Sequence, residues 1–403
     1  MKSTKVCDLA EQIRGVSYSR GEASDSPSPD CLPILRATNI TDNGLDLGSL
    51  VYVPKKRISE KQLLRKGDVV IAASSGSLDV VGKAAQFDLD LPISFGAFCK
   101  VLRPTKNINK KYFSYFFKTL AYRRTISLKA AGANINNLRN DDLDSLAIYV
   151  PSSDSQTKTV NILGAAEKAL NERREAIRLL DDFLKSTFFQ MFGDPITNPM
   201  GWNVKKLDDL ASTITNGTTP LGGENVYVKQ GITFFRSQNV WNNKLEYADI
   251  AYIDENMHRG MRKSSLKNGD ILMTKTGRFN TENSSLGRVA MFFGEDDSAN
   301  INGHVYLIRL DERIRKEFVL FVLTTSAYQN YIRTVSVGGI DKRQINKSHL
   351  QEFPIIFPPL NLQNKFVSTV ENAEKLKQKM KSSETELQNI FNCLMQKAFK
   401  GEL

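Results

Sequence analysis

The sequence predicts a mixed α/β (α+β) fold: a tandem repeat of two globular domains separated by two long antiparallel coiled-coil helices. Three observations lead to this prediction. The second half of the chain repeats phrases of the first half at an offset of about 200 residues. Each copy combines short apolar runs, typical of buried strands, with a longer segment of helical character. A segment with apolar residues at every seventh position then follows each copy.

The repeat consists of matched phrases that keep the same order along the chain. "LRATNITDN" (35–43) returns as "FRSQNVWNN" (235–243), and "LLRKGDVVIA" (63–72) returns as "SLKNGDILMT" (265–274). Three further matches are "GKAAQF" (82–87) with "GRVAMF" (287–292), "KYFSYFFKT" (111–119) with "KEFVLFVLT" (316–324), and "YRRTI" (122–126) with "YQNYI" (328–332). We interpret this series as a tandem duplication, so each element of the first copy should recur in the second.

The two globular domains are predicted to span residues 1–152 and 193–358. In each domain a Gly-Asp turn precedes a short apolar run, "KGDVVIAAS" and "NGDILMTKT", which predicts a buried strand. The segments "KKYFSYFFKTLAYRRTI" and "KEFVLFVLTTSAYQNYI" each predict one helix with a wide aromatic and aliphatic face. "LAIYVP" and "FPIIFPP" predict a closing strand that the proline ends.

The two long helices are predicted over residues 153–192 and 359–403, where apolar residues recur at an interval of seven. The predicted seam consists of Leu163, Leu170, Ile177, Leu184, Met191, Phe366, Ala373, Met380, Leu387 and Leu394. Because a globular domain lies between the end of the first helix and the start of the second, antiparallel contact is the simplest packing. The alternative is an amphipathic helix buried separately in each half.

Charged residues interrupt the second position of this seam, at Glu167, Arg174, Asp181, Lys377 and Glu384. They either fix the register of the helix pair or turn outward to meet another subunit. The sequence leaves both alternatives open.

The bulk composition suggests a polyanionic partner, and an ordinary solvated basic surface is the alternative. The net charge is +11 and the pI about 9.3, with the largest basic excess in residues 1–150. The longest apolar runs are too short to span a bilayer, so no membrane association is expected. The N-terminal residues lack the apolar core of a signal peptide, which predicts a cytoplasmic location.

Motifs for catalysis and metal binding are absent from the sequence. The four cysteines and three histidines are scattered without zinc-ligand spacing, so we expect no metal site and buried free thiols. The chain has no phosphate-binding glycine loop, and no Ser/His/Asp arrangement is legible. We therefore expect no catalytic site in this chain.

The repeat, the basic domains and the heptad helices together resemble the DNA-specificity (S) subunit of type I restriction–modification enzymes. The resemblance covers essentially the whole chain, and its local marks are "FFQMFGDP" at 188–195 and "LMQKAFKGEL" at 394–403. It implies two target-recognition domains that each read one half of a split site in double-stranded DNA. It also implies that the helices are spacers that set the distance between the half-sites.

The resemblance further implies the partners and cofactors of a bacterial or archaeal complex. Two methyltransferase (modification) subunits would dock on the helices and use S-adenosylmethionine for adenine-N6 methylation. Where a restriction subunit is present, two copies would add ATP- and Mg-dependent translocation and cleavage. No cofactor is expected to bind this chain itself.

Candidate DNA-contacting residues are polar positions that differ between the copies beside a shared scaffold, because base edges are recognised by such side chains on loops. In the first copy they are Ser74, Ser75, Ser77, Asn134, Asn136, Asn137 and Arg139. In the second copy they are Lys275, Thr276, Arg278, Asn280, Lys342, Arg343 and Gln344. The pairs Arg36/Arg236 and Asn39/Asn239 are also candidates, but their identity in both copies favours a scaffold or phosphate role.

Two other classes of function compete with the specificity subunit. A non-catalytic coiled-coil adaptor whose basic domains bind a non-DNA ligand would show salt-insensitive binding to protein or sugar. An enzyme that acts alone on DNA would methylate or cleave it as a purified chain, which the absent motifs disfavour.

Overall fold

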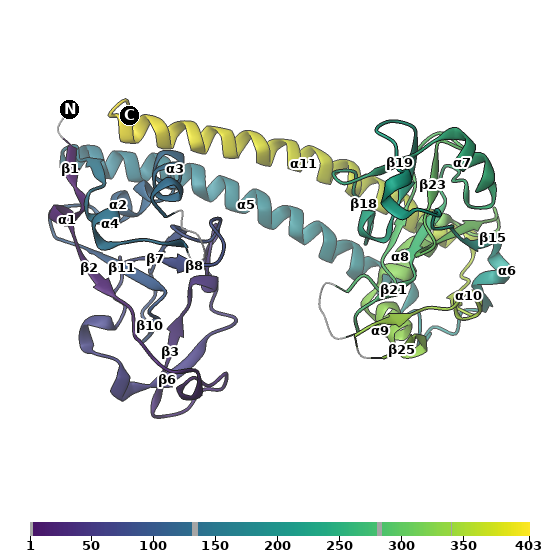
Figure 1. Ribbon diagram of the computed structural model, residues 1–403, viewed down its shortest axis with the longest axis horizontal. Helices are drawn as coiled ribbons and strands as arrows, with labels where there is room; N and C mark the ends of the chain where they lie inside the picture. The colour runs from purple at the N-terminus through teal and green to yellow at the C-terminus, as the bar shows by residue number, and fades with distance from the viewer. Residues whose placement is uncertain (1–2, 131–135, 280–283, 340) are drawn as a thin grey trace. The chain divides into compact units, whose positions relative to one another are not determined.

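The computed structural model describes residues 3–130, 136–279, 284–339 and 341–403 and divides into two compact units (Figure 1). Unit 1 comprises Met1–Glu175 and Met380–Leu403, and unit 2 comprises Ala176–Lys379. Each long helix therefore contributes residues to both units. The division into four consecutive segments made from the sequence stays a prediction.

Unit 1 is built around an antiparallel four-stranded sheet in the order β2-β11-β7-β9 and a three-stranded sheet in the order β10-β3-β6 (Figure 1). A third pairing joins β1 to β13, so the predicted closing strand pairs with the first strand of the unit. The strands are β1 (Ser3–Lys5), β2 (Ala10–Arg14), β3 (Cys31–Leu35), β4 (Ile40–Thr41), β5 (Gly44–Leu45), β6 (Val51–Pro54), β7 (Val69–Ala72), β8 (Ser74–Ser75), β9 (Ala84–Gln86), β10 (Ser94–Phe95), β11 (Cys99–Pro104), β12 (Asn136–Asn137) and β13 (Ala147–Tyr149). The helices are α1 (Val6–Leu9), α2 (Lys110–Phe116), α3 (Leu120–Ala130) and α4 (Asn140–Asp144).

Unit 2 repeats this topology, with sheets in the orders β15-β24-β20-β22 and β19-β16-β23 and a β14–β27 pair. Its strands are β14 (Val204–Lys206), β15 (Ala211–Asn216), β16 (Ile232–Phe235), β17 (Val240–Trp241), β18 (Lys244–Leu245), β19 (Ala251–Ile253), β20 (Ile271–Thr274), β21 (Thr276–Gly277), β22 (Val289–Met291), β23 (Ala299–Ile301), β24 (Val305–Leu310), β25 (Val337–Gly338), β26 (Arg343–Gln344) and β27 (Pro354–Ile356). Its helices are α6 (Leu207–Leu210), α7 (Glu255–Gly260), α8 (Lys316–Thr324), α9 (Ser326–Val335) and α10 (Lys347–Gln351). The predicted repeat and the mixed fold class are thus confirmed.

The Gly-Asp turn that precedes the central strand of each unit forms a buried ion pair. In unit 1, Asp68 is 1% exposed and lies 2.8 Å from the guanidinium of Arg103 on β11. In unit 2, Asp270 is 2% exposed and lies 2.6 Å from Arg309 on β24. Gly67 precedes Asp68 with a φ of +99°, a conformation that favours glycine. The turn therefore joins two strands of each sheet through charge as well as through the backbone.

The prediction of a single aromatic-rich helix in each copy is wrong, because a threonine divides each segment into two helices. Thr119 accepts a hydrogen bond from the Tyr122 N–H at its Oγ1 and donates one to the Phe116 carbonyl. Thr325 makes the same pair of bonds, with the Tyr328 N–H and the Val322 carbonyl. The hydroxyl thereby ends α2 or α8 and begins α3 or α9.

The sequence alignment of this segment is also wrong by one residue. The backbone N–H of Asn109 donates to Gln156 on α5, and the N–H of Arg315 donates to Gln363 on α11. Asn109 therefore corresponds to Arg315, so Lys110 corresponds to Lys316, rather than Lys111 as the matched phrases suggested. The short aromatic phrases tolerate this shift because apolar residues occupy most positions in both.

The two long helices are α5 (Ser153–Phe192) and α11 (Leu360–Lys400). None of the predicted seam residues is exposed: Leu163, Leu170, Leu184, Phe366 and Ala373 are buried, and Ile177, Met191, Met380, Leu387 and Leu394 are half-buried. The part of each helix within a unit packs against the core of that unit. The Phe399 ring, for example, lies 4.9 Å from the ring of Tyr112.

Four of the five charged seam residues pair between the helices, whereas Glu167 pairs with Lys118 of its own unit. In unit 1, Arg174 of α5 donates to Glu384 of α11 at 2.9 Å, and in unit 2, Lys377 of α11 donates to Asp181 of α5. Within unit 1, Leu163, earlier on α5 than Arg174, packs with Met395, later on α11 than Glu384, so the helix segments of this unit run antiparallel. Of the two alternatives, these four residues follow the first and fix the register.

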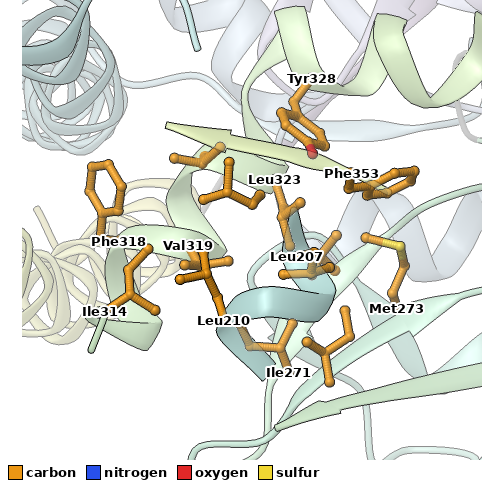
Figure 2. Packing of buried hydrophobic residues seen from close by; sticks show 14 of the residues in the cluster. Leu207, Leu210, Ile271, Met273, Ile314, Phe318, Val319, Leu323, Tyr328 and Phe353 are labelled. Carbon is orange, nitrogen blue, oxygen red and sulfur yellow. The ribbon is translucent and has the colours of Figure 1, made fainter. Parts of the chain in front are cut away.

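The core of unit 2 is its largest cluster of buried apolar side chains, and it draws on sheet, short helices and long helices together. Figure 2 shows Leu207 and Leu210 of α6 facing Ile271 and Met273 of β20. Phe188 of α5 belongs to the same cluster. The globular part of the unit is therefore not separable from the helices that pass through it.

The four cysteines differ in their exposure to solvent. Cys99 is buried, but Cys7 and Cys393 are exposed and Cys31 is half-buried, so the expectation of buried thiols is wrong for most of them. Burial raises the pKa of the Cys99 thiol to about 12.

Within the described ranges, no helix has the length and apolarity needed to cross a membrane.

Candidate nucleic-acid interface

In unit 1, three segments that are distant in the sequence meet at the end of β7. Strand β8 pairs with β12, with Ser74 opposite Asn137 and Ser75 opposite Asn136. Ala73 connects all three segments through its backbone: its carbonyl accepts from Leu138 N–H at 2.8 Å, and its N–H donates to the Phe98 carbonyl at 2.8 Å. We call residues 73–77, 96–98 and 136–139 the reading edge of unit 1.

The corresponding edge of unit 2 uses the same backbone bonds. Thr276 lies opposite Gln344 and Gly277 opposite Arg343, the register found in unit 1. The Lys275 carbonyl accepts from the Ile345 N–H at 2.9 Å, and the Lys275 N–H donates to the His304 carbonyl at 2.8 Å. We call residues 275–278, 302–304 and 342–344 the reading edge of unit 2. The two loops chosen from the sequence in each copy are therefore brought together.

The side chains on the unit 1 edge are mostly neutral and polar. Ser77, Asn137 and Arg139 are exposed, while Ser74 and Ser75 are half-buried. The Ser75 hydroxyl accepts from the Ser77 N–H at 3.2 Å and so shapes the turn. Of Asn136 only the backbone is described, and the candidate Asn134 lies outside the described residues.

The unit 2 edge is more basic. Arg278, Lys342 and Gln344 are exposed, and Lys275 and Thr276 are half-buried. The Lys275 ammonium lies 5.8 Å from the centre of the Tyr306 ring, a cation–π contact that holds the charge near the edge. The candidate Asn280 lies outside the described residues.

Arg343 was predicted to contact DNA, but its side chain is engaged within its own unit. Its guanidinium donates to the Ser336 carbonyl at 3.1 Å and lies 4.2 Å from the centre of the Phe279 ring. The geometry favours a scaffold role, in which Arg343 ties the β25–β26 hairpin to the loop after β21.

The Asn pair of candidates forms a turn scaffold in both units. Asn39 and Asn239 are 0% and 1% exposed. The Asn39 side-chain oxygen accepts from the Arg36 N–H, and its amide donates to the Asp46 carbonyl. Asn239 repeats these bonds. Burial leaves these side chains no access to DNA, so their identity in the two copies reflects a common turn.

The paired arginines differ in exposure. Arg236 is 8% exposed and donates to the Asp249 carbonyl, so it too serves the scaffold. Arg36 is exposed while its guanidinium donates to the Ser49 carbonyl at 3.1 Å. A phosphate contact from Arg36 stays a prediction.

Sequence reasoning missed the middle segment of each edge. The turns that hold Phe98 and His304 lie between strands, and the first of them, Gly96–Ala97–Phe98, contains no polar side chain to mark it. Following the repeat through these turns would have found both residues, since Cys99 and Val305 begin equivalent strands, β11 and β24.

The chemistry available at the two edges is that of recognition. Hydroxyls, amides and cations stand on a rigid frame of backbone hydrogen bonds, the groups that bind phosphates and base edges. In the part of the chain that the structure describes, no group of three or more His, Cys, Asp or Glu residues could hold a metal ion.

The comparisons with known proteins agree on one family. The family model for the type I restriction modification DNA specificity domain matches residues 1–178 and again residues 199–389. The StySPI type I restriction enzyme specificity subunit of Salmonella potsdam is 30% identical, over 99% of this chain and 88% of that protein. The EcoKI specificity subunit of Escherichia coli K12 is 28% identical over the same shares.

A solved structure shows the same fold. The type I restriction–modification S subunit from M. genitalium superposes with a TM-score of 0.52 at 13% identity, covering 99% of this chain and 96% of that one.

Proposed function

Because the chain belongs to the type I restriction–modification DNA specificity family, we propose that it is the specificity subunit of such a complex and that each unit reads one half of a bipartite, asymmetric DNA site. The observation that carries this proposal is the pair of reading edges: equivalent backbone bonds present different side chains. Equivalent frames bind similar DNA geometry, and different side chains select different bases.

Within the complex, this chain is a non-catalytic component. We propose that double-stranded DNA and two methyltransferase subunits are its partners, joined in some systems by two restriction subunits. S-adenosylmethionine would be used by the methyltransferase subunits, and ATP and Mg by the restriction subunits, with no cofactor bound here. Such a complex acts on the chromosome, which places it in the cytoplasm of a bacterium or archaeon.

The long helices fit the proposed roles of spacer and docking surface. Helix α5 has 40 residues and is therefore about 60 Å long, whereas one turn of DNA is about 34–36 Å. Leu179 and Phe183 lie one turn apart on α5 and are 51% and 52% exposed. Exposed apolar side chains at helical spacing suit contact with another subunit, and we assign these two to a methyltransferase subunit.

The decisive experiment maps N6-methyladenine across the host genome by single-molecule sequencing, with and without this gene. We expect one split, asymmetric motif to lose methylation on both strands when the gene is removed. Replacing residues 1–150 with the matching domain of a relative should change only one half of that motif. An unchanged methylation map, with the modification subunit expressed, would instead support an adaptor whose basic domains bind another ligand.

A further inference from the structure

The ring of Phe98 is an exposed apolar group in the middle of the polar reading edge of unit 1. It is 65% exposed, and the hydrogen-bonding candidates Ser74 and Asn137 belong to the same edge. Burial of a phenylalanine is favourable and its exposure is not, so a fold gains nothing by presenting this ring to water. The exposed ring therefore suits a surface that a binding partner covers.

The exposure does not come from a loose loop, because the turn that holds Phe98 is fixed by the backbone. The Phe98 carbonyl accepts from the N–H groups of Ala73 at 2.8 Å and Ser74 at 3.1 Å. The next residue, Cys99, is 0% exposed and begins β11. On the other side, the backbone of Gly96 approaches Gly15 so closely that no side chain would fit at Gly15.

Unit 2 shows that the fold does not require phenylalanine at this position. His304 occupies the same turn, and its carbonyl accepts the equivalent bond from Lys275. His304 is also exposed. Since the frame is the same and the side chain differs in polarity, the residue at this position belongs with the variable groups that distinguish the two edges.

We propose that Phe98 is a specificity-determining residue that places its ring against the bases of the half-site read by unit 1. This rests on the proposed function and adds an apolar contact to the hydrogen-bonding ones. An apolar side chain meets DNA bases at the 5-methyl group of thymine or at the face of a base whose step it opens. His304 gives unit 2 a polar group at the same place.

The first test compares Phe98→Ala with the wild-type chain in the complete methyltransferase complex. Phe293→Ala is the matched control, because Phe293 is 72% exposed but follows β22, at the opposite end of the unit 2 sheet from its reading edge. Affinity is measured on a duplex that holds the mapped motif. We expect Phe98→Ala to weaken binding about tenfold, as one base contact is worth, and to relax one position of one half-site. Phe293→Ala should bind as the wild type does.

Modified duplexes distinguish the two apolar contacts. Uracil in place of thymine in that half-site should weaken the wild type and leave Phe98→Ala unaffected if the ring meets a methyl group. Insertion at a base step should instead raise 2-aminopurine fluorescence with the wild type alone. Wild-type affinity and an unchanged motif for Phe98→Ala would overturn the inference. Absence of any split motif for the wild-type complex would overturn the proposed function as well.

Discussion

The short helices of the two units pack against the long helices α5 and α11 through different kinds of side chain. In unit 1, the Tyr115 hydroxyl donates to Glu167 at 2.9 Å, and the same carboxylate accepts from Lys118. In unit 2, the equivalent ring of Phe321 lies 5.0 Å from Phe188 and 4.9 Å from Phe366. A polar cluster and an aromatic cluster thus support equivalent helices.

Comparison of the two units separates the features that both copies retain from those that have diverged. The units share the buried Asp–Arg pair, the threonine between the short helices and the backbone bonds of the reading edge. Each of these acts at a point where the chain changes direction. Side chains that fill space or face solvent have diverged, because many residues can serve there.

The largest expected effect comes from the shared ion pair. Asp68→Ala and Asp270→Ala should each lower the free energy of unfolding of their own unit by about 3 kcal/mol, since each removes the buried carboxylate that neutralises a largely shielded arginine. The loss should be greater for Asp68, because the Arg103 side chain is 13% exposed and that of Arg309 is 26% exposed. Hydrogen exchange of peptides from β7 and β20 measures the two units separately.

The control for this comparison is Asp88→Ala, which removes a solvent-exposed partner of Lys66 at 3.9 Å. It should change stability by less than about 0.5 kcal/mol. Equal protection of β7 in Asp68→Ala and in the wild type would show that the pair is not part of the common frame.

The polar cluster should add an acid-sensitive contribution to the stability of unit 1 through Glu167. Burial by itself would raise the pKa of this carboxyl, but Lys118, Lys111 and the Tyr115 hydroxyl together hold it below its ordinary value of 4.5. A carboxyl with a lowered pKa in the folded state stabilises the fold above its ordinary pKa, and this contribution is lost as pH falls through the lower, folded value.

Glu167→Gln should therefore cost unit 1 about 2 kcal/mol at pH 7 and reduce the loss of stability around α2 as the pH falls below 4.5. Hydrogen exchange of α2 against pH measures this, with α8 of unit 2 as the internal reference. If α2 in the variant kept the acid sensitivity of the wild type, another group would be responsible.

At the reading edges, Arg278→Ala should relax or abolish recognition at one half-site and leave the other intact. A base contact from arginine is worth about 1–3 kcal/mol of discrimination. Methylation of duplexes substituted one base pair at a time gives the affected positions. Arg259→Ala, an exposed arginine on α7, is the matched control. Undiminished methylation of the original site would remove Arg278 from the interface.

The smallest effect should come from the shared threonine, and it should be equal in the two units. Thr119→Ala and Thr325→Ala each remove a helix cap and should cost about 1 kcal/mol. Thermal unfolding followed by calorimetry measures both. Thr125→Ala changes an exposed threonine within α3 and should have little effect. A clear inequality between the two caps would mean that one unit uses its threonine differently.

The sequence was sufficient to predict the repeat, the buried strands and the heptad helices, because each depends on a periodic pattern of apolar residues. It predicted one helix where Thr119 and Thr325 make two, since a cap inside an apolar segment is hidden by the hydrophobicity around it. The loops that the sequence singled out lie side by side in each unit, while their contact with DNA stays a prediction.

The sequence could not separate residues that face outward from residues that serve the frame. Arg343 and Asn239 have the side chains of DNA contacts, and only their bonds to the Ser336 and Glu246 carbonyls identify them as scaffold. Phe98 was missed for the opposite reason, because an apolar residue between two strands is expected to be buried.

The bonds that hold Ala73 and Lys275 in place have a consequence for how such a protein changes over generations. Every residue except proline carries the same peptide N–H and carbonyl, so most substitutions at the edge leave these bonds intact. If each edge selects bases as proposed, a substitution there alters the DNA sequence that is recognised while the fold is retained. One half of the target then changes while the other half stays as it was, and a lineage acquires a new target sequence one substitution at a time.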